Sequence, residues 1–142
     1  IDIFDMLLER LGKEVFCRLL PLCLVDNGSE FTNPMRLEFD GQGDYRTRLF
    51  YCDPASPHQR GSGENNHSFI RRILPKGASF DNLTQEQVNL MMNHINSYRR
   101  KNLGDLSPFE VFNAFHGEDI LAKLGAELIH HNDITLKPSL LR

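Results

Sequence analysis

Residues 24–31 read LVDNGSEF, where an apolar run ends in Asp26 and an Asn-Gly pair follows at once. The stretch from Leu19 to Val25 is typical of a buried strand, with Pro21 near its start. A hydrophobic strand that ends in a carboxylate allows two interpretations. Because Asp-Asn-Gly is a good turn sequence by itself, Asp26 is either a turn residue or part of a site.

The sequence around this stretch predicts an α/β chain with a mostly helical second half. Apolar residues recur at helical spacing over 2–18, interrupted by Gly12. A second short strand is expected over 49–52, ended by Asp53-Pro54, and the stretch 27–47 is expected to be loop or short irregular elements. Two helices are expected over 63–74 and 118–124. A third follows a capping box at 84–87, and its apolar face consists of Val88, Met91, Met92 and Ile95. A fourth begins after Ser107-Pro108, and its apolar face consists of Val111, Phe112 and Phe115. The tail 129–142 is ambiguous.

Composition excludes several classes of protein. The 142 residues are 40% hydrophobic and 25% charged, which is ordinary for a folded domain. The longest apolar stretch is too short to span a bilayer and no leader pattern opens the sequence, so we expect no membrane partner and no secretion. The three cysteines lack CxxC spacing and indicate reduced thiols in a cytoplasm. With a net charge of −3, any contact with nucleic acid must come from local patches.

Two carboxylates stand out by their context. Asp26 ends the first strand, and Glu64 opens a helix after the loop 54–63. Carboxylates at a strand end and in the first turn of a facing helix can converge on one point. Two such hard oxygen ligands suit Mg²⁺ or Mn²⁺, which can activate a hydroxyl for displacement at phosphorus. The ordinary alternative for Glu64 is a helix-start acid favoured by the helix dipole.

The helix that begins near Glu64 is predicted to have two different faces. At helical spacing, His67, Ser68 and Arg71 share the side of Glu64, whereas Phe69, Ile70 and Ile73 lie on a side that can be buried. With Arg60, Arg72 and Lys76 nearby, a phosphate backbone could be drawn across the polar face. A solvated surface is the ordinary alternative. The second basic run, 99–101, has a similar alternative as the charged end of a helix.

Three stretches together resemble the catalytic core of bacterial insertion-sequence transposases. They are VDNGSEF (25–31), FYCDPASPHQRGSGENNHSFIRRILPKGASF (50–80) and NSYRRKNLGDLSPFEVF (96–112). The nearest branch is the insertion sequence thirty family, within the integrase-core superfamily. The resemblance covers about residues 1–115, and its middle block is the most specific part.

The resemblance implies a ribonuclease H-like integrase-core fold and a site of three metal-binding acids, Asp-Asp-Glu. By position Asp26 matches the second acid and Glu64 the third, and Asn27 and Gly28 would make the close turn after the strand. The implied cofactor is Mg²⁺ or Mn²⁺, and the implied reaction is strand cleavage and transfer of DNA at transposon ends and target, in a bacterial cytoplasm. Residues expected to contact the DNA are Arg60, His67, Arg71, Arg72 and Lys76.

The sequence also departs from the family pattern. In the family the first acid lies on a strand upstream of the position where this sequence begins, and Asp2 and Asp5 are poor substitutes because they fall in a helical pattern. We therefore expect an N-terminally truncated core over 1–115, cut artificially or encoded by a truncated gene, and a helical extension with a tail over 116–142. Such a chain should be inactive alone. It should also form a homo-oligomer, because the first strand normally covers the strand that ends at Asp26.

Two other functions remain open. The chain could be a non-catalytic remnant that serves in oligomerisation or DNA binding. It could also be a hydrolase that uses Asp26 and Glu64 as an acid/base pair in sugar cleavage, although the chain has no tryptophan for a sugar to stack on.

Overall fold

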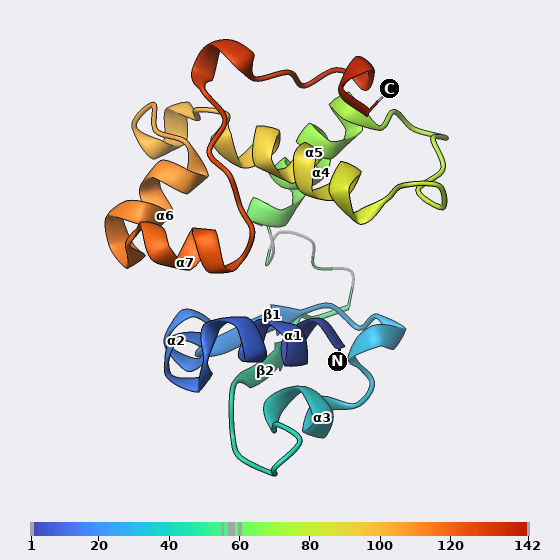
Figure 1. Ribbon diagram of the computed structural model, residues 1–142. Helices are drawn as coiled ribbons and strands as arrows, with labels where there is room; N and C mark the ends of the chain where they lie inside the picture. The colour runs from blue at the N-terminus through green and yellow to red at the C-terminus, as the bar shows by residue number, and fades with distance from the viewer. Residues whose placement is uncertain (1, 55, 57–58, 60, 142) are drawn as a thin grey trace. The chain divides into compact units, whose positions relative to one another are not determined.

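The computed structural model describes residues 2–54, 56, 59 and 61–141, with the side chains of 61–64 left out. The chain forms two compact units, Ile1–Gly61 and Ser62–Arg142, each described here by itself (Figure 1). Helices and a small parallel sheet together make a mixed α/β protein, as the sequence predicts. The predicted division near residue 115 stays a prediction. None of the helices among the described residues is long and apolar enough to cross a membrane.

The first unit builds its core on one face of a two-stranded parallel sheet. Its elements are α1 (Asp2–Leu11), α2 (Lys13–Leu19), β1 (Leu22–Val25), the 3₁₀ turn η1 (Ser29–Phe31), α3 (Pro34–Glu38) and β2 (Arg48–Tyr51). The register pairs Leu22 with Arg48 and Val25 with Tyr51. Val25 and Leu49 of the sheet pack with Leu37 of α3, and the half-buried Phe4, Cys23 and Phe31 cover this cluster.

Several predicted boundaries in this unit are corrected. The single helix expected over 2–18 is two helices, because Gly12 adopts φ 76°, a left-handed value that ends α1. Leu19 belongs to α2, so the first strand starts only after Pro21 and not at 19. The second strand runs over 48–51 and not over 49–52.

The expectation of a buried first strand is wrong for most of its length. Leu22 is 56% exposed and Leu24 43% exposed, and only Val25 is buried. Side chains alternate between the two faces of a strand, so Leu22 and Leu24 lie opposite the core. Phe50, which pairs with Leu24, is 47% exposed on the same outer face. Within the described part of this unit, that face is therefore only partly covered.

A buried arginine joins α1 and α3 of the first unit. The side chain of Arg46 is 1% exposed and donates through Nε to the Leu37 carbonyl at 2.9 Å and through a terminal nitrogen to the Arg36 carbonyl at 2.8 Å. Its other terminal nitrogen pairs with the carboxylate of Asp5 on α1. These carbonyls belong to the last turn of α3, which has no helical donors left for them. Arg46 therefore satisfies the end of α3 and fastens α1 to it.

The second unit is a group of helices closed by a long tail. Its elements are α4 (Gly61–Ile73, beginning at the unit boundary), α5 (Gln85–Ser97), the 3₁₀ turn η3 (Lys101–Leu103), α6 (Pro108–His116), α7 (Glu118–Lys123) and the 3₁₀ turns η4 (His131–Asp133) and η5 (Pro138–Leu141). Both predicted capping boxes are present, at Thr84 with Gln87 and at Ser107 with Glu110. The core of the unit consists of Ile73, Leu74, Met91 and Ile95.

The predicted apolar face of α6 is partly wrong. Phe115 is 79% exposed, whereas Phe109 is 7% exposed and lies inside. Helical periodicity sets the angle between two side chains but does not say which side faces a neighbour.

The ambiguous tail is a strap that runs back along α5 (Figure 1). The backbone N–H of Ile129 donates to Ser97 Oγ at 2.9 Å, that of Thr135 to His94 Nδ1 at 3.0 Å, and Gln87 Nε2 donates to the Leu141 carbonyl at 3.1 Å. Leu136, Leu140 and Leu141 pack against the core of the unit. The strap thus supplies part of the cover that the helices lack.

Replacing Arg46 by methionine should destabilise the first unit. The variant leaves the end of α3 without donors, and unsatisfied buried carbonyls cost about 1–3 kcal/mol each, so we expect a loss of about 2–4 kcal/mol in the free energy of unfolding. The measurement is urea denaturation followed by circular dichroism. Arg48→Met is the matched control, since Arg48 is exposed at the start of β2. Equal effects of the two substitutions would contradict the role of Arg46.

Stability should also fall as the pH is lowered through the ordinary histidine range. Burial lowers the pKa of His94 below its usual 6.5, opposed by the nearby Asp133 carboxylate. The folded chain therefore binds fewer protons there than the unfolded chain, so stability is full above pH 6.5 and is lost as the pH falls toward the lower folded pKa. A pH series of urea titrations measures the effect. His94→Asn, which can still accept from Thr135 but does not titrate, should flatten it, and His67→Asn on the exposed face of α4 should leave it unchanged.

Candidate functional site

Asp26 lies at the carboxyl edge of the parallel sheet, as predicted. The Cys52 N–H donates to the Val25 carbonyl at 2.8 Å, so the parallel pairing continues to the last residue before Asp26. The Asp26 side chain is exposed, and its Oδ1 accepts from the Gly28 N–H at 3.3 Å. The turn interpretation is thus realised in this structure. A carboxylate on an exposed strand end nevertheless keeps oxygens toward solvent, where a cation could meet them.

Asn27 and Gly28 follow Asp26 in the turn at the end of β1. Gly28 has φ −66° and ψ 154°, an extended conformation that other residues also adopt. Asn27 makes the distinctive contact, because its Nδ2 donates across to the Cys52 carbonyl at 3.1 Å. Its amide therefore joins the two strand ends and fixes the backbone on either side of the edge.

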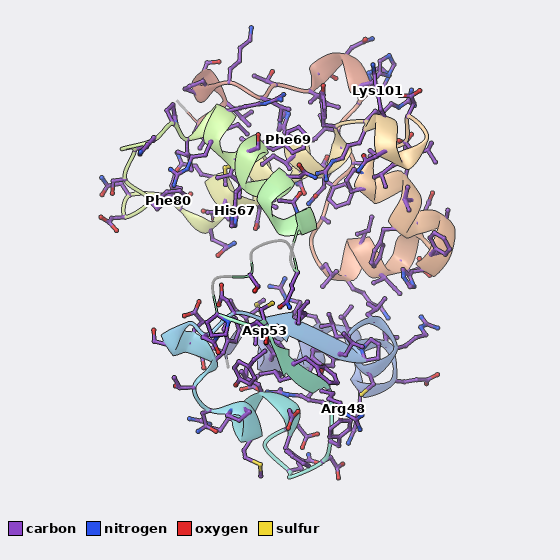
Figure 2. All side chains as sticks on the ribbon, turned by 180° about the vertical axis from the view of Figure 1, so that it is seen from behind. Arg48, Asp53, His67, Phe69, Phe80 and Lys101 are labelled. Carbon is purple, nitrogen blue, oxygen red and sulfur yellow. The ribbon has the colours of Figure 1, made fainter. Side chains whose placement is uncertain are left out.

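A second acid, Asp53, follows β2 at the same edge (Figure 2). Its N–H donates to Gln59 Oε1 at 2.9 Å, and Gln59 Nε2 donates back to Asp53 Oδ2 at 2.9 Å. This reciprocal pair brings Gln59 back onto the strand end. The sequence predicts Asp53 only as the residue that ends a strand. The available signal was that Asp53, like Asp26, comes directly after a short apolar strand.

The donor chemistry of this edge fits a hard divalent cation, but the described residues do not assemble a complete site. No group of three or more His, Cys, Asp or Glu side chains gathers around one point in that part of the chain. Asp26 supplies carboxylate oxygens of the kind that Mg²⁺ and Mn²⁺ bind. Glu64 is in the first turn of α4, but its side chain lies outside the described residues. Asp26 and Glu64 belong to different units, so their convergence stays a prediction.

The two faces predicted for α4 are confirmed by burial. His67, Ser68 and Arg71 are exposed, Phe69 and Ile70 are half-buried, and Ile73 is 1% exposed. Arg71 lies over the ring of Phe80, with its guanidinium carbon 5.8 Å from the ring centroid, and Arg72 lies over Phe69 at 5.0 Å. Lys76 is exposed beyond the helix. Arg60 lies outside the described residues. The polar face therefore exists, and the roles predicted for its residues stay predictions.

The chain is similar to transposases of bacterial insertion sequences. The transposase for insertion sequence element IS4351 of Bacteroides fragilis is 31% identical over 108 residues, which are 73% of this chain and 31% of that protein. The transposase for insertion sequence element IS1086 of Cupriavidus metallidurans is 39% identical over 64 residues, 45% of this chain and 19% of that protein. Transposase InsI for insertion sequence element IS30A of Escherichia coli is 36% identical over 64 residues, 45% of this chain and 17% of that protein.

The matched stretches cover at most 31% of the length of these three relatives. No protein-family profile matches the chain. No solved structure matches it either.

Proposed function

Because this chain belongs to the insertion-sequence transposase and integrase family, we propose that it is part of a metal-dependent enzyme that cuts DNA strands and transfers them to a target. The observation that carries the proposal is the placement of Asp26, exposed at the carboxyl end of β1. The resemblance assigns the second metal-binding acid to this position. The proposed architecture is the ribonuclease H-like integrase core, of which the parallel pair β1 and β2 would be two strands.

In this proposal Asp26 and Glu64 hold Mg²⁺ or Mn²⁺. The ion, when bound, activates a hydroxyl or water and stabilises the leaving oxygen at phosphorus. The chain's own residues position the Asp26 carboxylate. The Asn27 amide fastens the end of β1 to the Cys52 carbonyl, which keeps the backbone beneath the Asp26 carboxylate in place. Small displacements at such a site are costly, since phosphoryl transfer depends on the placement of the reacting groups.

The exposed residues of α4 are proposed to contact the DNA backbone. His67, Arg71 and Arg72 are exposed along the helix, and Lys76 follows it. Cations in this arrangement attract phosphates without reading sequence, so their contribution should weaken as salt is raised. Arg60 is proposed for the same role on the resemblance alone.

The metal site can be tested without catalysis. Titration of the chain with Mn²⁺, followed by water-proton relaxation, should show binding that Asp26→Asn and Glu64→Gln each weaken by at least about tenfold, because loss of a direct ligand exceeds the usual cost of losing an outer contact. The control is Asp119→Asn, which removes an exposed carboxylate on α7. Binding that is unaffected by Asp26→Asn would remove the enzyme proposal and leave the non-catalytic alternative.

The chain by itself should not cut DNA, because two carboxylates hold catalytic metals less well than three. Incubation with Mn²⁺ and DNA that carries terminal repeats of an insertion sequence should yield no specific product. Specific cleavage that disappears in Asp26→Ala would show that the two acids suffice.

One observation favours the second candidate function, self-assembly. The outer face of the sheet presents Leu22, Leu24 and Phe50 to solvent, and β1 is hydrogen-bonded to β2 alone among the strands of the described residues. An apolar face beside an open strand edge tends to pair with another chain. We propose that residues 1–26 take part in a homodimer or larger assembly.

Light scattering behind a sizing column measures this assembly at micromolar concentration. The unchanged chain should be a dimer or larger, and Leu24→Lys should shift it toward the monomer by placing a charge on the apolar face. Leu128→Lys is the control, since Leu128 is 51% exposed in the second unit. A monomeric unchanged chain that unfolds cooperatively would refute the assembly.

A further inference from the structure

The second unit contains a cluster of aromatic rings and cations. The guanidinium carbon of Arg100 is 4.7 Å from the centroid of the Phe69 ring, and that of Arg72 is 5.0 Å from it. The ring of Tyr98 is a further neighbour, with its centroid 5.5 Å from that of Phe69 and a tilt of 54°. We name Phe69, Tyr98, Arg100 and Lys101 the Phe69 cluster.

The cluster borders an open hollow of about 450 Å³. Every charged residue that the structure describes around the hollow is a cation, and the remaining ones are aromatic or amide side chains. The lining consists of Asn65, Phe69, Tyr98, Arg99, Arg100, Lys101 and Asn102 (Figure 2 labels Phe69 and Lys101). On a chain of net charge −3, such a concentration of positive charge selects for anions.

The loop that carries the cations is held in one conformation. The Arg100 N–H donates to the Leu106 carbonyl at 3.0 Å, and the Asp105 N–H donates to the Arg100 carbonyl at 3.2 Å. The turn between them needs two left-handed residues in succession, Gly104 at φ 67° and Asp105 at φ 61°. A non-glycine residue is uncommon in that region, so the loop adopts it at some cost in free energy. The backbone at Arg100 and Lys101 is thereby held by the loop's own hydrogen bonds.

The side chain of Arg100 does not behave as a charge at a helix end. Its guanidinium lies over the Phe69 ring, and a terminal nitrogen donates to Asn66 Oδ1 on α4 at 3.2 Å. Its Nε is buried and has no acceptor among the described residues. Burial also lowers the pKa of Arg100, because the charged form loses its water. An anion in the hollow would stabilise this guanidinium, because it would offset the free energy lost when the charge is removed from water.

The two neighbouring cations differ in their availability. Arg99 is paired with the carboxylate of Glu110 at 3.2 Å, which restrains it. Lys101 is exposed, and its ammonium makes no ion pair within the described part of the chain. Tyr98 is 38% exposed, whereas the Phe69 ring is contacted by two guanidinium groups. Lys101 and Tyr98 are therefore the groups that a ligand would meet first.

We propose that the Phe69 cluster binds an unpaired nucleotide of a DNA strand, with the phosphate at Arg100 and Lys101 and the base against Tyr98. The choice of DNA as the strand rests on the proposed function. The preference for an unpaired nucleotide comes from the Tyr98 ring, because a base can stack on this ring only when it is not stacked between its neighbours in a duplex. A paired duplex offers the cluster phosphates alone.

Fluorescence anisotropy of a labelled oligothymidylate, with the full chain in the presence of a chelator, tests the pocket. Tyr98→Leu should weaken binding of the single strand between about fivefold and a hundredfold, the range for loss of one stacked base, whereas Tyr98→Phe should preserve it. Lys101→Gln should weaken binding and reduce the salt slope by about 0.7 for the loss of one phosphate contact. Circular dichroism of each variant checks that the helices are intact.

The matched control for charge is Lys123→Gln, an exposed lysine on α7 of the same unit. Single-strand binding that survives Tyr98→Leu, or that responds equally to Lys101→Gln and Lys123→Gln, would overturn the proposal. So would a matched duplex that loses as much affinity as the single strand on Tyr98→Leu, or an oligoglutamate that competes as well as the oligonucleotide. Because the chelator removes divalent ions, this experiment does not depend on metal binding by Asp26 and Glu64. Loss of the proposed single-strand binding would therefore not contradict the metal site, and an absence of Mn²⁺ binding would not contradict the nucleotide site.

Discussion

Burying the guanidinium of Arg46 is unfavourable unless each of its donors finds an acceptor, and the first unit is arranged around that requirement. The acceptors come from the last turn of α3 and from Asp5 on α1. The same segment leads into β2, where the Leu49 N–H donates to the Glu38 carboxylate at 2.9 Å. A parallel pair of two short strands is marginal in water. Here α1 and α3 are joined because a single buried cation needs acceptors from both, and Arg46 lies two residues before β2.

That framework decides where the candidate site can lie. Parallel strands end at one edge, so the chain leaves β1 and β2 side by side and places Asp26 and Asp53 after them. Amide side chains then secure the edge, Asn27 between the strands and Gln59 on Asp53. The backbone beside each acid is thus hydrogen-bonded, at Val25 and Cys52 for Asp26 and at its own N–H for Asp53. Precise placement of charge at such an edge is what metal-assisted chemistry at phosphorus needs.

Local chemistry made much of this fold predictable. The capping boxes at Thr84 and Ser107, the two faces of α4 and the acid at the end of β1 all follow from residues within one or two turns of each other. The burial of Arg46 could not be predicted, because its partner Asp5 is 41 residues away in the chain. The exposure of Leu24 depends on what covers the outer face of the sheet. For the candidate site, the sequence predicted the position of Asp26, whereas its convergence with Glu64 depends on how two units meet.

The strap along α5 has a mechanical consequence. Its hydrogen bonds run in reverse order to the helix, from Ser97 near the strap's beginning to Gln87 at its end. Tension applied at the C-terminus therefore loads the bond at Leu141 first, and the bonds at Thr135 and Ile129 carry load only after it has opened. Hydrogen bonds arranged in this way break one after another. Opening the bonds in this order uncovers the side of the core that packs against Leu140 and Leu141 first and the side beneath Leu136 after it.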